Sequence, residues 1–117
     1  PKEPDVFAKL KPIWGLEIYR NRLRIREPRT GRAGERSATY PFSTASLLIA
    51  EDECLEQEVR MLSEEYFGRA GLFGRFPEIH VTHLDAILTE AEVASLHEAL
   101  TNAGASKIVL TPHRELP

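Results

Sequence analysis

The chain has 117 residues, of which 42% are hydrophobic and 28% are charged, and its net charge is −3 at pH 7. This length and composition favour one soluble domain with a single core. No apolar run approaches the roughly 18 residues of a membrane span, which excludes a transmembrane class, and the single cysteine, Cys54, excludes an intramolecular disulfide and fits a reducing cytoplasm.

Hydrophobic spacing and turn residues predict seven elements. In chain order they are strands over 13–19, 23–26 and 37–42, a helix over 52–67, a strand over 79–84, a helix between Thr89 and Gly104, and a strand over 107–111. The first two strands form a hairpin around the turn Arg20-Asn21-Arg22. A second turn over 30–34 precedes the third strand, which Pro41 keeps near an edge of the sheet.

Apolar residues at helical spacing define the two helices. The stripe of the first helix is Leu55, Val59, Leu62 and Tyr66, and that of the second is Val93, Leu96, Leu100 and Ala103. The first helix is expected to stop at Gly68, while Thr89 and Glu92 form a Thr-x-x-Glu capping box at the start of the second. The last strand is of the buried type.

The element order β-β-β-α-β-α-β predicts an α/β fold. Three antiparallel strands followed by helical crossovers to parallel strands give a mixed sheet with helices packed on it, which is the ribonuclease H-like, or actin-like, arrangement. We expect a lead-in over 1–12, one domain over 13–111 and a tail over 112–117. The chain opens with Pro1 and not Met and has no signal-peptide pattern, which fits an expressed piece or a processed chain from which N-terminal signals are missing.

The charges are unevenly distributed along the chain. Seven arginines fall between residues 20 and 36, namely Arg20, Arg22, Arg24, Arg26, Arg29, Arg32 and Arg36. Seven acids follow them, namely Glu51, Asp52, Glu53, Glu56, Glu58, Glu64 and Glu65. An electrically two-sided domain is expected, which favours head-to-tail contacts, although two solvated faces without a partner give the same pattern.

Parts of the chain resemble a known family. The segment 77–81, the capped helix start at 88–92 and the Ala-Gly-Ala turn within 98–110 resemble subdomain IA of MreB, the bacterial actin. The opening 15–18 is similar to the first strand of that family. The resemblance implies a minimal actin-like module that acts by protein contact in bacterial cell-shape or cytoskeletal organisation.

The first hairpin departs from that family. There it carries Asp-x-Gly-Thr/Ser, whose glycine lets backbone N–H groups approach phosphate, whereas Glu17, Tyr19 and Arg20 stand at the corresponding positions here. The chain also ends soon after Leu110, where the family continues into the half that closes over the nucleotide. We therefore expect no competent ATP binding, no cofactor and no enzymatic activity.

Glu17 and Asp85 are the candidate catalytic residues of an alternative function. In this topology both should lie near the ends of adjacent strands, where ribonuclease H-like nucleases gather carboxylates around two metal ions. No third acid is evident. A small metal-dependent nuclease is therefore kept as the alternative, on fold-level analogy alone.

The candidate metal ligands are three histidines, His80, His83 and His97. A spacing of three on a strand sends side chains to opposite faces, and no cysteine or paired acid completes a set. Partly exposed structural histidines, and no metal site, are therefore expected.

Arg20, Arg22, Arg24 and Arg26 are the candidate partner-binding residues. On one strand face they would lie about 6.6 Å apart, near the spacing of successive phosphates. The acidic overall balance and the lack of an aromatic platform argue against nucleic acid. An acidic protein surface is expected instead, on another copy of the chain or on a larger actin-like protein, although a solvated edge hairpin is an equal alternative.

Phe7 and Trp14 lie in or beside a short amphipathic lead-in. The segment is too short to bind a membrane alone, so any membrane contact is expected to be weak. Packing of both rings over the domain's own core is the default.

Overall fold

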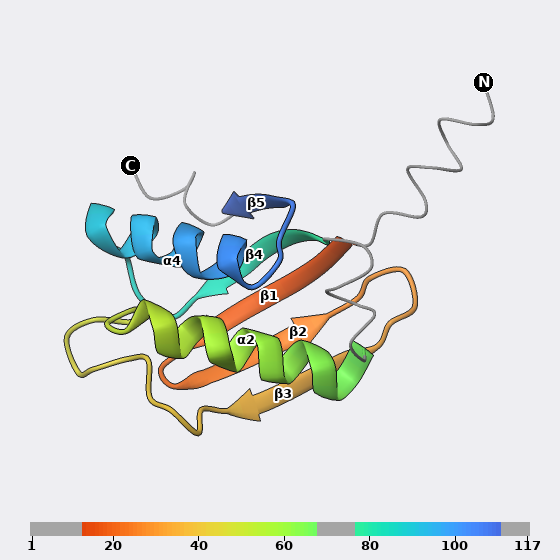
Figure 1. Ribbon diagram of the computed structural model, residues 1–117, viewed down its shortest axis with the longest axis horizontal. Coiled ribbons are helices and arrows are strands. Elements are labelled where there is room, and N and C mark those ends of the chain that lie inside the picture. Colours follow the sequence, from red (N-terminus) through yellow and green to blue (C-terminus); the bar gives the residue numbers. More distant parts are fainter. Residues whose placement is uncertain (1–12, 68–76, 111–117) are drawn as a thin grey trace.

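The computed structural model describes residues 13–67 and 77–110. Within these ranges the chain forms, in order, β1 (Ile13–Tyr19), β2 (Arg22–Arg26), β3 (Ala33–Ser37), α2 (Asp52–Phe67), β4 (Glu78–Leu84), α4 (Glu90–Asn102) and β5 (Lys107–Leu110). The α/β class and the succession of strands and helices agree with the prediction (Figure 1). The predicted lead-in and tail fall outside the described residues.

The strands form one mixed sheet in the order β3-β2-β1-β4-β5. β1 pairs antiparallel with β2 and parallel with β4, while β3 is antiparallel to β2 and β5 is parallel to β4. Both helical connections therefore advance in the same direction across the sheet. Since such crossovers are right-handed, both helices should cover one face. Figure 1 shows α2 and α4 side by side on the same face.

The core lies between the sheet and the helices. β1 contributes Trp14, Leu16 and Ile18, which are at most 2% exposed, and alternate residues of β2 and β4 join them. The helices add Leu55, Val59, Leu62, Leu96, Ala99 and Leu100. Trp14 thus packs in the core, as expected by default, while Phe7 lies outside the described residues. None of the described helices is both long and apolar enough to cross a membrane.

The prediction of the third strand over 37–42 is wrong. β3 spans Ala33–Ser37, and the segment 38–51, called the long connection below, contains no helix or strand. Gly34 is typical of a turn, but here it allows a close approach between β3 and α2. A Cβ atom on Gly34 would lie 2.2 Å from the ring of Tyr66. The inward position of β3 therefore has no room for a side chain.

The hairpin turn is shorter than predicted, because Arg22 belongs to β2 and pairs with Tyr19. Asn21 takes the left-handed conformation, with φ of 53°. Asparagine tolerates this conformation better than most residues, which explains its place in so tight a turn.

The predicted bounds of the two helices and the capping box are confirmed, while Gly68, the expected stop of the first helix, lies outside the described residues. α2 begins at Asp52, and α4 begins after Thr89, whose Oγ1 accepts a hydrogen bond from the Glu92 N–H at 3.1 Å. Val93 of the predicted stripe is only partly buried, whereas Glu92 is buried. β5 is partly exposed and not a fully buried strand, because it forms an edge of the sheet.

Asn21 is the first of three anchors that hold the long connection. Its Oδ1 accepts hydrogen bonds from the Phe42 N–H at 2.9 Å and the Ser43 N–H at 2.8 Å. The Asn21 N–H donates in turn to Ser43 Oγ at 3.2 Å. The Asn21 side chain thus provides the acceptor for two backbone N–H groups of the connection. Phe42 is fully buried beside it.

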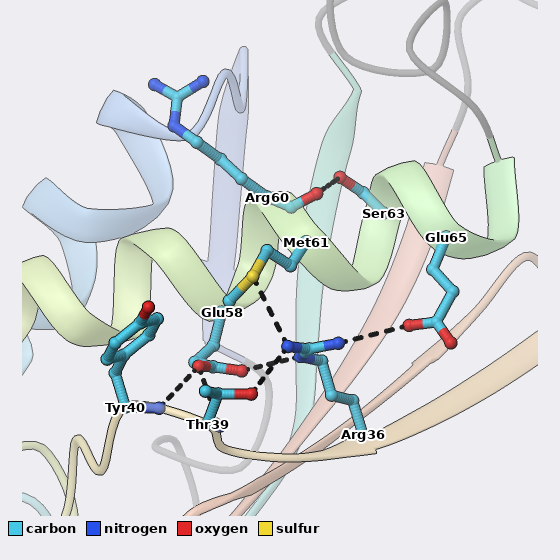
Figure 2. A network of polar contacts seen from close by, with 8 residues as sticks. All are labelled: Arg36, Thr39, Tyr40, Glu58, Arg60, Met61, Ser63 and Glu65. Carbon is cyan, nitrogen blue, oxygen red and sulfur yellow. Dashed lines mark hydrogen bonds and ion pairs between the residues drawn. The ribbon is translucent and has the colours of Figure 1, made fainter.

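Glu58 is the second anchor, and it is fully buried. Figure 2 shows its carboxylate in contact with Arg36, Thr39 and Tyr40. It accepts hydrogen bonds from Arg36 Nε at 2.8 Å, from the Thr39 N–H at 3.0 Å and from the Tyr40 N–H at 2.9 Å. The bond to Glu58 raises the pKa of Arg36. Arg36 is only partly buried, so the buried partner of this pair is Glu58, which the two backbone N–H groups and Arg36 together compensate.

Glu92 is the third anchor and also completes the capping box. One carboxylate oxygen accepts from the Thr89 N–H at 2.9 Å, and the other accepts from the Ile49 N–H at 3.0 Å. Burial by itself raises the pKa of Glu92, but these backbone hydrogen bonds outweigh it and lower the pKa below its ordinary value of 4.5. The ionised form is therefore the one that the fold binds.

The lowered pKa of Glu92 predicts a loss of stability in acid. Stability from a carboxylate of depressed pKa is complete above its unfolded pKa and is lost as the pH falls through the folded one. The free energy of unfolding should thus fall below about pH 4.5, and Glu92→Gln should be less stable at neutral pH but less sensitive to acid. Urea denaturation from about pH 7 to about pH 3 measures both slopes. Glu90→Gln, at an exposed position of the same helix turn, is the control, and equal slopes for Glu92→Gln and the unchanged chain would contradict the prediction.

Candidate functional site

The face of the sheet opposite α2 and α4 carries the polar side chains of the strands. This outer face comprises Gly15, Glu17 and Tyr19 of β1, Arg22, Arg24 and Arg26 of β2, Glu35 of β3, and His80 and His83 of β4. Residues opposite one another in neighbouring strands share a face, so these side chains lie in rows across the sheet. All of them are at least partly exposed.

The arginines of β2 form a column along the outer face. Arg22, Arg24 and Arg26 alternate with the buried Leu23 and Ile25, as the sequence predicts. Arg22 forms an ion pair with Glu35, and Arg24 Nη1 lies 3.9 Å from Glu17 Oε1. Such exposed pairs contribute about 0–1 kcal/mol each, so a partner's carboxylates can replace them at small cost.

Arg20 does not belong to this column, contrary to the prediction. It lies in the hairpin turn, and its guanidinium donates to the Thr44 carbonyl at 3.2 Å and the Ala45 carbonyl at 3.1 Å. Shortening of the turn moves Arg20 out of the strand and toward the long connection. Arg20 therefore holds the connection and is not part of the candidate site.

Tyr19 is the centre of a cluster on the outer face. Its hydroxyl donates to Glu17 Oε1 at 2.5 Å, the Arg22 guanidinium lies 4.1 Å from its ring centroid, and the His83 ring centroid is 4.8 Å away. Arg22 and His83 reach the ring from the strands on either side of β1. The hydrogen bond to Glu17 raises the pKa of Tyr19, so the phenol stays protonated and serves as a donor.

His80 and His83 lie on the same face, which corrects the argument that their spacing separates them. A register shift in the β1–β4 pairing leaves Thr82 without a partner, so that His80 pairs with Gly15 and His83 with Glu17. The shift is a β-bulge with one extra residue in β4. Because of that residue, His83 lies on the same face as His80 although the two are three positions apart. His97 lies on α4, against the other face, so the structure does not gather the three histidines.

The histidines have carboxylate neighbours but form no metal centre within 13–67 and 77–110. His80 Nε2 lies 2.7 Å from Glu78 Oε2. His83 Nε2 lies 3.5 Å from Asp85 Oδ1, is buried and makes no hydrogen bond to a described residue. In those ranges no three residues among histidine, cysteine, aspartate and glutamate converge as metal ligands would.

Glu17 lies two residues before the end of β1, and Asp85 directly follows β4, the neighbouring strand. The Asp85 N–H donates to the Ile18 carbonyl at 3.0 Å, which continues the β1–β4 pairing beyond Leu84. Glu17 is engaged by Tyr19 and is near Arg24, and Asp85 is close to His83. Glu17 therefore has a hydrogen-bond donor of its own, whereas Asp85 lies near His83 without a hydrogen bond to it.

The predicted separation of positive and negative faces is partly cancelled within the fold. Arg36 of β3 binds Glu58 and also Glu65 of α2, where Arg36 Nη1 to Glu65 Oε1 is 3.4 Å. The arginines that remain on the surface of the sheet are those of β2. On β2 the charge available for a partner is thus the column of Arg22, Arg24 and Arg26.

Shallow hollows elsewhere offer little chemistry. One of about 290 Å³ is lined by Tyr40, Glu53, Cys54 and Gln57. Burial, together with the negative charge of Glu51 and Glu53, raises the pKa of the Cys54 thiol. Little thiolate is present at neutral pH, which disfavours a nucleophilic cysteine.

Comparisons with known proteins add no relative. Neither a family model, nor a curated protein, nor a solved structure matches this chain. The outer face is the candidate site because of its geometry and its charge.

The contacts of Tyr19 predict a raised pKa for its phenol. Because the hydrogen bond to Glu17 raises the pKa of Tyr19, this phenol should ionise at a higher pH than an unperturbed tyrosine. Glu17→Gln removes the carboxylate acceptor and should lower that midpoint. Ultraviolet titration measures the phenols, with Tyr19→Phe to identify the affected one and Tyr40→Phe as the control. A midpoint that does not respond to Glu17→Gln would show that the hydrogen bond is absent in solution.

Proposed function

We propose that this chain is a minimal actin-like module, similar to subdomain IA of MreB, that acts by protein contact through its outer face. Its setting would be bacterial cell-shape or cytoskeletal organisation in the cytoplasm. The observation that carries the proposal is the column of Arg22, Arg24 and Arg26 on a strand that is buried on its other side. A rigid, regularly spaced row of exposed guanidinium groups is well suited to bind carboxylates.

The sheet supports the actin-like, ribonuclease H-like part of the proposal. Three antiparallel strands occupy one side of the sheet, and β4 and β5 extend it parallel to β1 after helical crossovers. Fold alone does not carry a function. The arginine column therefore remains the functional argument, and the sheet is its support.

The absence of ATP binding is part of the proposal. At the position where the family has its phosphate-loop glycine, the Tyr19 side chain is held by Glu17 and contacted by Arg22. A phosphate group approaching the backbone there would have to displace this ring. Calorimetry with Mg²⁺-ATP tests the point, and micromolar affinity would refute it.

A small metal-dependent nuclease is the alternative, favoured by the adjacent positions of Glu17 and Asp85. Glu17 is already engaged by the Tyr19 hydroxyl, and no third acid joins Glu17 and Asp85 within 13–67 and 77–110. We therefore expect no cleavage of single-stranded, branched or hybrid nucleic acids with Mg²⁺ or Mn²⁺. Incubation of the chain with these substrates tests the alternative. Cleavage that Glu17→Gln abolishes would replace the contact proposal by the nuclease.

We predict that the chain associates with itself or with a purified actin-like protein, and that salt weakens the association. Charges on exposed side chains are screened beyond about 8 Å at physiological ionic strength. Replacing Arg22 and Arg24 by glutamine should weaken binding about fivefold or more, from about 0.5 kcal/mol or more for each exposed charge contact. Sedimentation at low and high salt measures the effect.

A matched control removes the same net charge from the opposite side of the domain. Ala94→Glu with Thr101→Glu, at exposed positions of α4, also lowers the net charge by two. This variant should associate like the unchanged chain. Equal weakening by both variants, or a monomer that binds no partner at any salt concentration, would contradict the proposed function.

A further inference from the structure

The three arginines of the column differ in their neighbours. Arg24 lies between Glu17 of β1 and Glu35 of β3 in the register of the sheet. Arg26 lies between Gly15 and Ala33, neither of which has a polar side chain. Arg26 is exposed and forms no ion pair with any residue of the described ranges. The end of the column at Arg26 therefore carries the least compensated charge.

Small neighbours also leave space around Arg26. Gly15 presents no side chain beside Arg26, Ala33 presents only a methyl group, and Arg26 itself is exposed. A ligand can thus approach the Arg26 guanidinium from directly above the sheet. At Arg24 the same approach meets the side chains of Glu17 and Glu35, which repel an anion.

The spacing of the column indicates the form of the ligand. Alternate residues of a strand lie about 6.6 Å apart on one face. An extended peptide with an acidic residue at every second position repeats at the same distance. Its carboxylates can meet successive arginines without a change of register.

We infer that Arg26, with Arg24 next to it, anchors an extended acidic segment of a partner protein whose carboxylates occupy every second position. The inference rests on the proposed function, because it names the partner chemistry of the same outer face. Arg22 contributes least, since Glu35 and the ring of Tyr19 already engage its guanidinium.

A single-stranded nucleic acid fits this face less well. Such ligands bind by stacking bases on exposed aromatic rings along a positively charged groove. The ring of Tyr19 is contacted by the Arg22 guanidinium and by the His83 ring.

The test uses two synthetic peptides with equal numbers of glutamates. In one, glutamate and serine alternate; in the other, two serines separate successive glutamates. The full chain should bind the alternating peptide more tightly, and Arg26→Ala should weaken that binding about fivefold. Ala33→Glu places an internal carboxylate beside Arg26, as Glu35 stands beside Arg24, and should weaken binding to a similar extent. Ala33→Gln, which adds bulk without charge, should bind as the unchanged chain does.

Three results of the peptide test would overturn the inference. The first is equal affinity for the two peptides, together with an equal loss of affinity in Arg26→Ala and Lys107→Ala. Lys107 is another exposed cation of the sheet. The second is tighter binding of an oligothymidine strand than of either peptide. The third is no peptide binding at all. Association measured by sedimentation bears on the proposed function separately, so a protein contact that survives Arg26→Ala would refute the inference and keep the contact proposal.

Discussion

The central constraint on this fold is that the backbone N–H groups of the long connection have no neighbouring strand or helix turn to accept their hydrogen bonds. The long connection runs from β3 to α2 and places Phe42, Leu48 and Ile49 in the core, which takes their neighbouring N–H groups away from water. Such groups need acceptors, because an unpaired buried N–H is costly. Glu58, Glu92 and Asn21 supply them. The connection can therefore close one end of the core even though it has no regular structure.

The outer face is a consequence of the topology. Because both crossovers advance in the same direction, α2 and α4 take one side of the sheet, and the strands bury alternate residues there. The remaining side chains of β1, β2 and β4 gather on the other side, where Tyr19 and His83 come together from strands that are far apart in sequence. The candidate site is thus the polar half of an alternation whose apolar half forms the core.

Local patterns in the sequence predict much of this structure. The two helices, the capping box at Thr89, β1 and the arginines of β2 all follow from spacing and capping rules. β3 does not follow from these rules. Its inward residue is Gly34, which the close contact with Tyr66 requires, so the strand lacks the alternation of apolar and polar residues that predicts a strand. The bulge at Thr82 also has no local signature, so the placement of His83 on the outer face depends on pairing between strands. The roles of Glu58 and Glu92 as acceptors for the long connection depend on tertiary contacts in the same way.

The long connection also constrains the order of folding. Its acceptors come from the hairpin turn, from α2 and from α4, and the bond between Ile49 and Glu92 joins residues 43 positions apart in the sequence. Each acceptor can hold its part of the connection only once its own element has formed, so we expect the connection to be fully held only after both helices have docked. Contacts that form late are weak in the transition state, and their strength governs the rate of unfolding more than the rate of folding. The lifetime of the folded domain therefore depends on side chains that contribute little to its initial collapse.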